Sequence, residues 1–275
     1  MTDHPSPSAP FEIRRGSSPV ILGMPHTGTH VPQDIAARLN AHGRTVGDTD
    51  WHIHRLYEDL LPEATVVRAT FSRYVIDANR DPSGHSLYPG QNTTSLVPLT
   101  DFDDVPIWRD GEAPTDTDIA ERIAGFHRPY HAAIEAEIAR VKAEHGVAVL
   151  FDCHSIRSKI PFLFEGVLPA LNLGTDGGLT CDAAIESVAV EVAKASGFSH
   201  VLNGRFRGGW TTRHYGKPED GVHAIQLELA QSTHLASESL PYDYDPEKAA
   251  SLRPVLARML SEIEAAALRL AGKSA

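Results

Sequence analysis

Cysteine is scarce in this sequence, and long apolar runs are absent. The 275 residues include 2 cysteines, too few to hold a chain of this length together by disulfide bonds. Apolar runs such as residues 147–151 (VAVLF) are far shorter than the roughly 20 residues that cross a bilayer. Residues 1–10 are rich in Ser and Pro and lack the basic and apolar regions of a signal peptide. We therefore expect a cytoplasmic protein with no membrane partner.

Basic clusters are also missing. The chain has 25 Lys and Arg against 36 Asp and Glu, and 25 − 36 gives a formal charge of −11. A surface that binds a nucleic acid duplex needs a basic face, so we expect no nucleic acid partner. The hydrophobic content of 41% is enough for a sizeable core. We expect a disordered tail over residues 1–15 and a single domain over residues 16–275.

Short apolar strands alternate with helical patterns along the chain. Strands are expected at residues 20–24, 64–70, 74–78, 147–151, 200–203 and 224–229, and helices at 31–40, 51–61, 116–145, 182–196 and 246–270. Pro129 should bend the longest of these helices or divide it. This alternation favours an α/β sandwich around a mainly parallel sheet. The loop over residues 82–113 is long for a compact domain, and loops of that length are usually functional or mobile.

Polar residues follow the apolar strands at the positions where open α/β sheets bind ligands. They are His26, Asn79, Arg80, Asp152 and His154; Glu228 lies near the end of the strand expected at residues 224–229, and Asp50 stands at the start of an expected helix. Two histidines and a carboxylate, with a fourth position left to water, are the usual ligands of a catalytic zinc ion. His26, His154 and Asp50 can supply this set, with Asp48 and Asp152 as alternative carboxylates. Glu228, a carboxylate in an apolar strand, is suited to general acid–base catalysis.

Each of these residues also has an ordinary structural explanation. A lone histidine more often makes a structural hydrogen bond than binds a metal, and Asp50 alone is most simply a helix cap. His127 and His131 have the spacing of zinc-binding helices, but they lack the intervening glutamate of the His-Glu-x-x-His motif and Pro129 separates them. A structural role is therefore favoured for that pair.

Arginines form a second group of candidate site residues. They are Arg73, Arg80, Arg157, Arg205 and Arg213. In an acidic protein, arginines near a metal site suggest bidentate recognition of a carboxylate substrate. The alternative is ordinary pairing with surface Asp and Glu side chains. Residues 208–213 (GGWTTR) are expected to form a tight loop that brings the backbone close to a ligand.

Several motifs together make the chain recognisable. They are residues 24–28 (MPHTG), 48–53 (DTDWHI), 72–80 (SRYVIDANR), 152–158 (DCHSIRS), 202–209 (LNGRFRGG) and 226–230 (QLELA). In this order, over nearly the whole chain, they resemble the N-formylglutamate amidohydrolases. The resemblance implies a three-layer α/β/α sandwich of the phosphorylase/hydrolase type with a mainly parallel or mixed sheet, similar to zinc carboxypeptidases.

The resemblance also implies roles for individual residues. His26, Asp50 and His154 would bind Zn²⁺, Glu228 would act as the acid/base, and Asn79 with Arg80 would hold a substrate carboxylate. Arg73 would assist on the same side, and Arg157, Arg205 or Arg213 would hold a second carboxylate. The function implied is zinc-dependent hydrolysis of N-formyl-L-glutamate to L-glutamate and formate in histidine degradation. The alternatives are another N-acyl amino acid, such as N-formyl- or N-formimino-aspartate, or a non-catalytic amino-acid-binding protein.

Overall fold

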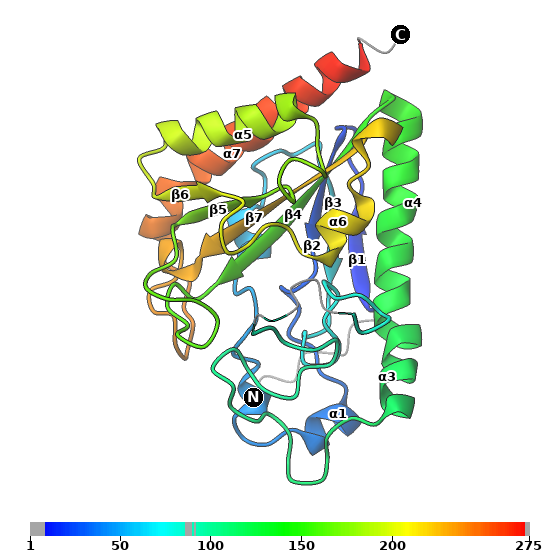
Figure 1. Ribbon diagram of the computed structural model, residues 1–275, viewed down its shortest axis with the longest axis vertical. Helices are drawn as coiled ribbons and strands as arrows, with labels where there is room; N and C mark the ends of the chain where they lie inside the picture. Colours follow the sequence, from blue (N-terminus) through cyan, green and yellow to red (C-terminus); the bar gives the residue numbers. More distant parts are fainter. Residues whose placement is uncertain (1–8, 86–89, 91, 273–275) are drawn as a thin grey trace.

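A mixed sheet forms the centre of the computed structural model, which describes residues 9–85, 90 and 92–272 (Figure 1). Its strands are β1 (Phe11–Arg14), β2 (Val20–Met24), β3 (Thr65–Ala69), β4 (Ala148–Ile156), β5 (Leu171–Gly174), β6 (His200–Leu202) and β7 (Val222–Ala230). Their order is β1-β3-β2-β4-β7-β5-β6. The four central strands β3, β2, β4 and β7 are parallel, whereas β1 and β5 run antiparallel to their neighbours β3 and β7.

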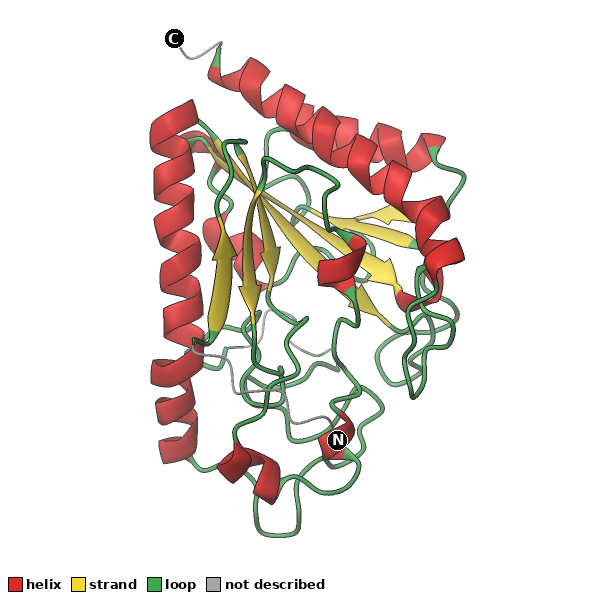
Figure 2. Cartoon of the chain, turned by 180° about the vertical axis from the view of Figure 1, so that it is seen from behind, coloured by secondary structure: helices red, strands yellow, loops and turns green. Residues whose placement is uncertain are grey.

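Helices cover both faces of this sheet. The α-helices of the described residues are α1 (Gln33–Arg38), α2 (Ile53–Leu56), α3 (Asp116–Arg122), α4 (Arg128–His145), α5 (Ala183–Ala195), α6 (Trp210–Tyr215) and α7 (Pro246–Ala271). Helices α5 and α7 lie side by side on one face, and α4 runs along the other (Figures 1 and 2). The predicted α/β sandwich is confirmed, with a sheet of mixed direction. No helix within the described parts of the chain combines the length and apolar character needed to cross a membrane.

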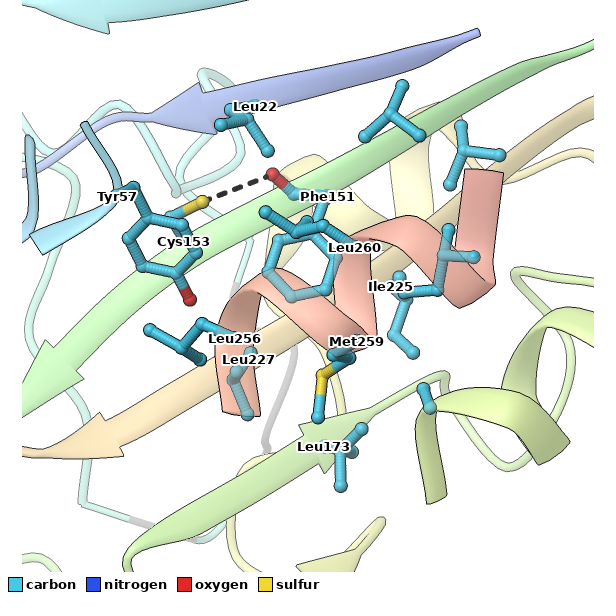
Figure 3. Close-up of a cluster of buried hydrophobic side chains, with 14 of the residues drawn as sticks. Leu22, Tyr57, Phe151, Cys153, Leu173, Ile225, Leu227, Leu256, Met259 and Leu260 are labelled. Atoms are coloured by element: carbon cyan, nitrogen blue, oxygen red, sulfur yellow. Dashed lines mark hydrogen bonds between the residues drawn. The ribbon is translucent and has the colours of Figure 1, made fainter. Parts of the chain in front are cut away.

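Strand β4 is buried on both faces, and its side chains alternate between two cores. Phe151 and Cys153 pack with Met259 of α7 on one face, as Figure 3 shows. Ala148 and Leu150 pack against α4 on the other. A shift of one residue would exchange the two sets, so packing fixes the register of β4 strongly. The side chains at the carboxyl end of β4 therefore have fixed directions.

The prediction of a disordered tail over residues 1–15 is wrong for the second half of that range. Residues 1–8 lie outside the described residues, but β1 pairs with β3 in antiparallel register from Phe11 opposite Ala69 to Arg14 opposite Val66. The amide of Thr70 also donates to the carbonyl of Pro10. β3 would otherwise be an edge strand with unpaired backbone groups, and β1 satisfies them.

Two further expectations near the site are corrected. The helix expected at residues 51–61 is only α2, because His52 and Asp59 adopt positive φ angles of 60° and 58° that a right-handed helix does not accommodate. Residues 74–78 form no strand. The amide of Val75 donates to Ser72 in a turn, and that of Asp77 donates to Leu96, so neither joins a ladder.

The long helix expected at residues 116–145 is divided, as Pro129 predicts. A π-helical turn, Ile123–His127, connects α3 to α4, and Pro129 lies in the first turn of α4. The sequence patterns predict neither the strand β5 nor the helix α6. Helix α6 occupies most of the stretch predicted as a tight loop, while Gly208 keeps the loop conformation with φ of 111°.

Candidate active site

A pocket opens at the carboxyl ends of the central parallel strands. Seven of the predicted site residues line it: His26, Arg73, Asn79, Arg80, His154, Arg205 and Glu228. The long loop over residues 82–113 contributes Asn92, Thr93, Thr94 and Phe102 to the same walls. The prediction that ligands bind at this edge of the sheet therefore agrees with the location of the pocket.

His26, Asp50 and His154 lie together, and the two histidines line this pocket. One ligand atom from each residue lies within 4.8 Å of the others, and all three side chains are buried. His26 follows β2, His154 is near the end of β4, and the loop that carries Asp50 is tied to β2 because the Asp50 amide donates to the His26 carbonyl. Nδ1 of His154 is 3.1 Å from Oδ2 of Asp50, and Nδ1 of His26 is 3.8 Å from the same atom.

The donor atoms in this group fit a metal ion. Among the described residues, Nδ1 of His26 and Oδ1 of Asp50 are buried without a hydrogen-bond partner. An unpaired buried polar atom costs on the order of 1–3 kcal/mol, which a bound cation would offset. Nitrogen and carboxylate ligands in this number are those that zinc prefers at catalytic sites. The residues present are therefore compatible with the metal that the sequence suggests.

Two further carboxylates lie behind the histidines. Nε2 of His26 donates to Asp77 over 2.7 Å, and Nε2 of His154 is 3.0 Å from Asp152. Such outer carboxylates fix the ring orientation and the tautomer of metal-binding histidines. Thr212 in turn donates to the second oxygen of Asp152 over 3.0 Å.

The geometry distinguishes the three aspartates considered as ligands. Asp50 lies in the group with both histidines, whereas Asp152 lies behind His154. Asp48 turns away and accepts a hydrogen bond from the amide of Phe102 over 3.0 Å. Burial raises the pKa of Asp48 to about 7.

Neighbouring charges outweigh the effect of burial on the pKa of His154 and of Asp50, but not on that of His26. Burial lowers the pKa of His154, but the carboxylates of Asp152 and Asp50 more than offset it and hold that pKa well above its ordinary value. Burial raises the pKa of Asp50, yet the hydrogen bond to His154 and nearby positive charges leave it below its usual range. The pKa of His26 is lowered, first by burial and then by the Arg73 guanidinium.

Glu228 lies beside His154 on the neighbouring strand. The two residues are partners in the register of the parallel β4–β7 ladder, and both side chains line the pocket. Gln226, two residues earlier on the same face of β7, donates to Oε2 of Glu228 over 3.1 Å. Burial raises the pKa of Glu228 to about 8, although the charges of His154 and Arg73 oppose the change.

Three arginines line the pocket, Arg73 and Arg80 from residues 72–80 and Arg205 from a separate loop. Arg73 donates to Asp77 over 2.7 Å, and its Nη1 is 3.8 Å from Asp50. Arg80 donates to the carbonyl and hydroxyl oxygens of Thr94 over 3.0 Å each. Arg205 donates over 3.0 Å to the carbonyls of Leu163 and Asn92. These contacts join the pocket walls and leave cationic groups along them.

Arg157 and Arg213 are not among the residues that line this pocket. Arg157 pairs with Asp103 at 2.8 Å, and Arg213 pairs with Asp176 at 3.2 Å and donates to the Gly208 carbonyl. Ordinary ion pairing, the alternative explanation for the arginines, describes the contacts of these two. Sequence spacing could not reveal this because their partners come from separate loops.

The sequence reasoning did not single out Asp77, Gln226 or Phe102. Asp77 is fully buried and contacts His26 and Arg73 at once. The argument that identified Glu228, a carboxylate in a run of apolar residues, applies equally to Asp77 and could have found it. Phe102, whose ring lies 4.8 Å from the Arg73 guanidinium, carries no signal except its place in a long loop.

Comparison with known proteins identifies the family. The sequence profile described as N-formylglutamate amidohydrolase matches residues 18–235. The chain belongs to the N-formylglutamate amidohydrolase family. This amidohydrolase is 46% identical over 256 residues to the N-formylglutamate deformylase of Pseudomonas aeruginosa, with 92% of this chain and 95% of that protein covered. The N-formylglutamate deformylase of Pseudomonas putida is 43% identical over 257 residues, with the same coverage of 92% and 95%.

Solved structures share the fold of this amidohydrolase. The crystal structure of N-formylglutamate amidohydrolase from Ralstonia eutropha JMP134 aligns with a TM-score of 0.73 at 23% identity, over 96% of this chain and 98% of that one. A gene product of Agrobacterium tumefaciens aligns with a TM-score of 0.70 at 19% identity, over 93% and 95% of the two chains. These alignments agree with the α/β architecture described above.

Proposed function

We propose that this enzyme hydrolyses N-formyl-L-glutamate to L-glutamate and formate. The observation that carries the proposal is the buried group of His26, Asp50 and His154 beside Glu228, in a pocket that Arg80 and Arg205 also line. A hydrolytic centre and cationic side chains thus share one cavity. Two relatives at 46% and 43% identity are named N-formylglutamate deformylase, which supports the same substrate.

Zinc is the metal we propose for this group. His26 and His154 would bind it through Nδ1, because Nε2 of each ring faces Asp77 or Asp152, and Asp50 would bind through its carboxylate. When bound, the ion would polarise the formyl oxygen as a Lewis acid and acidify a water molecule. The protein's own contribution is to hold the two rings and the carboxylate rigidly in a buried place.

Glu228 is the general acid–base of the proposal. Its carboxylate would accept a proton from the attacking water and deliver that proton to the nitrogen that leaves as the amine of glutamate. A pKa of about 8 is close to neutral pH, and a cation bound nearby would lower it by favouring the charged form. Gln226 holds one carboxylate oxygen and so limits the rotation of the side chain.

Two substrate carboxylates require two anchors. Asn79 lies next to the centre, with its Nδ2 3.1 Å from Nε2 of His154, so we assign Asn79 and Arg80 to the α-carboxylate that adjoins the formamide. Arg205 reaches the pocket from a separate loop, and we assign it to the side-chain carboxylate. An Arg–carboxylate pair is strong when it is bidentate and shielded from water.

Arg73 is suited to the charge that develops during attack. It lines the pocket, and within the described part of the chain its buried Nε has no hydrogen-bond partner. A cationic donor aimed at a developing oxyanion lowers the barrier because it is already oriented before the reaction. We therefore assign Arg73 to the formyl oxygen rather than to a substrate carboxylate.

We further propose that the reaction is a cytoplasmic step of histidine degradation, carried out by a single domain. Cys153 and Cys181 are free and buried, which suits a reducing compartment. The site combines side chains that follow β2 with others from β4 and β7, strands from different parts of the chain. Such a site needs these segments in one folded unit.

The experiment is a substrate comparison with purified enzyme of known metal content. Formate release from N-formyl-L-glutamate is compared with release from N-formyl-L-aspartate, and ammonia or formamide release from N-formimino-L-glutamate is followed in parallel. We expect the highest kcat/KM for N-formyl-L-glutamate, because a misplaced carboxylate leaves an arginine unpaired. A higher value for the aspartate derivative, or protein without a stoichiometric divalent metal that still turns over, would contradict the proposal.

A further inference from the structure

The segment from Asp77 to Arg80 carries Asn79 and Arg80 into the pocket without regular secondary structure. The amide of Asn79 donates to Oδ1 of Asp77 over 2.8 Å, and that of Arg80 donates to the Asp77 carbonyl over 3.2 Å. The carbonyl of Asn79 accepts from Nη1 of Arg80 over 3.1 Å. The conformation of this segment is therefore set by individual hydrogen bonds and not by a ladder.

Two histidines bind the remaining carbonyls of the segment. Nε2 of His131 is 2.7 Å from the carbonyl oxygen of Ala78, and Nε2 of His127 is 3.0 Å from that of Arg80. A carbonyl only accepts hydrogen bonds, so each Nε2 must carry the proton and donate it. The two bonds hold the main chain on either side of Asn79, and we refer to His127 and His131 as the histidine pair.

The π-helical turn explains how both histidines face the same segment. Pro129 has no amide hydrogen, and in an α-helix its ring would meet the carbonyl of Gly125. The wider turn over Ile123–His127 accommodates it before α4 begins. His127 and His131, four residues apart, then lie on one face with their ring centres 4.3 Å apart.

The environment of His131 leaves it one hydrogen to donate. Burial lowers the pKa of His131 to about 3, so the ring is neutral at physiological pH. Its Nδ1 is 2.9 Å from the hydroxyl of Tyr215, which donates to it. The single ring hydrogen is thus directed at Ala78.

The side chain of Asn79 is held from the opposite direction. Its Oδ1 accepts a hydrogen bond from the amide of Thr211 over 2.8 Å, which directs the NH₂ group toward the pocket. A Cβ atom at Gly209 would lie 2.3 Å from that nitrogen, so this position has no room for a side chain. Trp210, between these residues, packs edge-on against His131 with ring centres 4.7 Å apart.

We propose that His127 and His131 are positioning residues that fix Asn79 and Arg80 in the orientation needed to bind the substrate α-carboxylate. Neither histidine is among the residues that line the pocket, and both act through the backbone of residues 78–80. The inference rests on the proposed hydrolysis of N-formyl-L-glutamate. It assigns a function to a pair whose spacing alone resembles a metal site.

The test compares variants that remove or keep the hydrogen-bond donor supplied by Nε2 of each histidine. His127→Leu and His131→Leu remove it, whereas His127→Gln and His131→Gln place an amide nitrogen near the position of Nε2. Each variant is assayed with N-formyl-L-glutamate and with N-formyl-4-aminobutyrate, which lacks the α-carboxylate. In the Leu variants, KM for N-formyl-L-glutamate should rise on the order of tenfold, whereas kcat should change much less. The KM for N-formyl-4-aminobutyrate should also change much less. The Gln variants should restore most of the wild-type preference.

His223→Leu serves as the matched control. His223 is a buried histidine whose Nδ1 accepts from the amide of Asp182, and it is not part of the pocket lining. Its replacement should leave the preference between the two substrates unchanged even if stability falls. Folded Leu variants of the histidine pair that keep the wild-type preference would overturn the inference.

A second measurement separates this inference from the proposed function. Amide hydrogen exchange is followed at Asn79 and Arg80 in protein without substrate. Exchange there should accelerate at least several-fold in the Leu variants and return toward wild type in the Gln variants. If wild-type enzyme releases no formate, the proposed function fails, and the exchange result still decides whether the pair fixes the segment. Unchanged exchange in both Leu variants overturns the inference.

Discussion

The pocket is built by two regions that determine side-chain position in different ways. In the β4–β7 ladder, a continuous run of paired residues places His154 opposite Glu228. In the irregular residues 72–80, neighbouring side chains and distant histidines set the position of Asn79 and Arg80. The ladder depends on packing on two faces, whereas the irregular segment depends on a few specific hydrogen bonds. We expect the ladder to tolerate changes around it better than the segment does.

The largest expected effect comes from the ladder itself. Glu228→Gln should reduce kcat by about 10³-fold, because general acid–base groups contribute roughly 10²–10⁴ and the amide cannot accept the proton. The metal content should stay at the wild-type value, since Glu228 is not one of the grouped ligands. Formate release and elemental analysis check both statements.

Glu137→Gln is the control for that substitution. Glu137 is also buried, but it lies on α4 and pairs with Arg15 and Arg140, and it is not part of the pocket lining. This variant should lose stability and keep kcat. Near-wild-type turnover by metal-loaded Glu228→Gln would contradict the assignment of Glu228 as the general acid–base.

The second effect concerns Arg205, in the loop between β6 and α6, which lines the pocket outside the ladder. Arg205→Met should lower kcat/KM for N-formyl-L-glutamate by roughly 100-fold, because a charge-assisted hydrogen bond is worth about 1.5–3 kcal/mol. N-formyl-L-norvaline, which lacks the side-chain carboxylate, should be affected far less. Arg207→Met changes an exposed arginine of the same loop and should leave both values near wild type. Equal losses on the two substrates would reject Arg205 as the anchor.

Substitutions of Asp77 and Asp152 allow a direct comparison of the two regions, because each side chain lies behind one histidine of the metal group. Asp152→Asn, in the ladder, should weaken metal affinity by about 10–100-fold and leave KM of the reloaded enzyme unchanged. Asp77→Asn should weaken metal affinity similarly and also raise KM, because Asp77 holds the amide of Asn79. Metal titration and steady-state kinetics at saturating zinc separate the two. An unchanged KM for Asp77→Asn would contradict the comparison.

The smallest effect is the contribution of His131 to the pH dependence of the free energy of unfolding. The folded-state pKa of His131 is about 3, below the ordinary 6.5, so below pH 6.5 the unfolded chain binds a proton that the folded protein does not. His131 therefore lowers the free energy of unfolding by about 2 kcal/mol between pH 7 and pH 5. The carboxyls of Glu228 and Asp48, with pKa values of about 8 and about 7, act in the opposite direction over this range.

The measurement is consequently a difference between two proteins. Urea unfolding of wild type and His131→Gln is compared at pH 7 and at pH 5. The stability advantage of wild type over the variant should shrink by about 2 kcal/mol at the lower pH, while a comparison between pH 7.5 and pH 8.5 should show no change. A constant difference from pH 7 to pH 5 would mean that His131 gains a proton in the folded state.

The sequence predicts the ladder region well, for physical reasons. A short, β-branched apolar run such as residues 147–151, in a chain where strands alternate with helices, favours a buried parallel strand. Polar residues at the carboxyl end of such a strand lie at the edge where ligands bind. His154 and Glu228 could be identified in this way. His26 and Asp50 follow similar local signals, and the structure brings them into one group with His154.

The irregular segment could not be predicted because its partners are distant in the chain. Residues 74–78 have the β-branched and aromatic composition of a strand, yet the Val75 carbonyl accepts from Arg122 and that of Ala78 accepts from His131. These contacts override the local preference. The same limit applies to Arg157 and Arg213, whose ionic partners Asp103 and Asp176 stand in other loops.

Strand β1 has a practical consequence for anyone who shortens or tags this protein. A truncated chain that begins at residue 16 would uncover the outer edge of β3 and offer its backbone groups to other molecules, a common route to aggregation. An affinity tag joined directly to Phe11 would disturb the same pairing. Any recombinant version should therefore keep Pro10, whose carbonyl accepts from Thr70, and carry its fusion upstream of that residue.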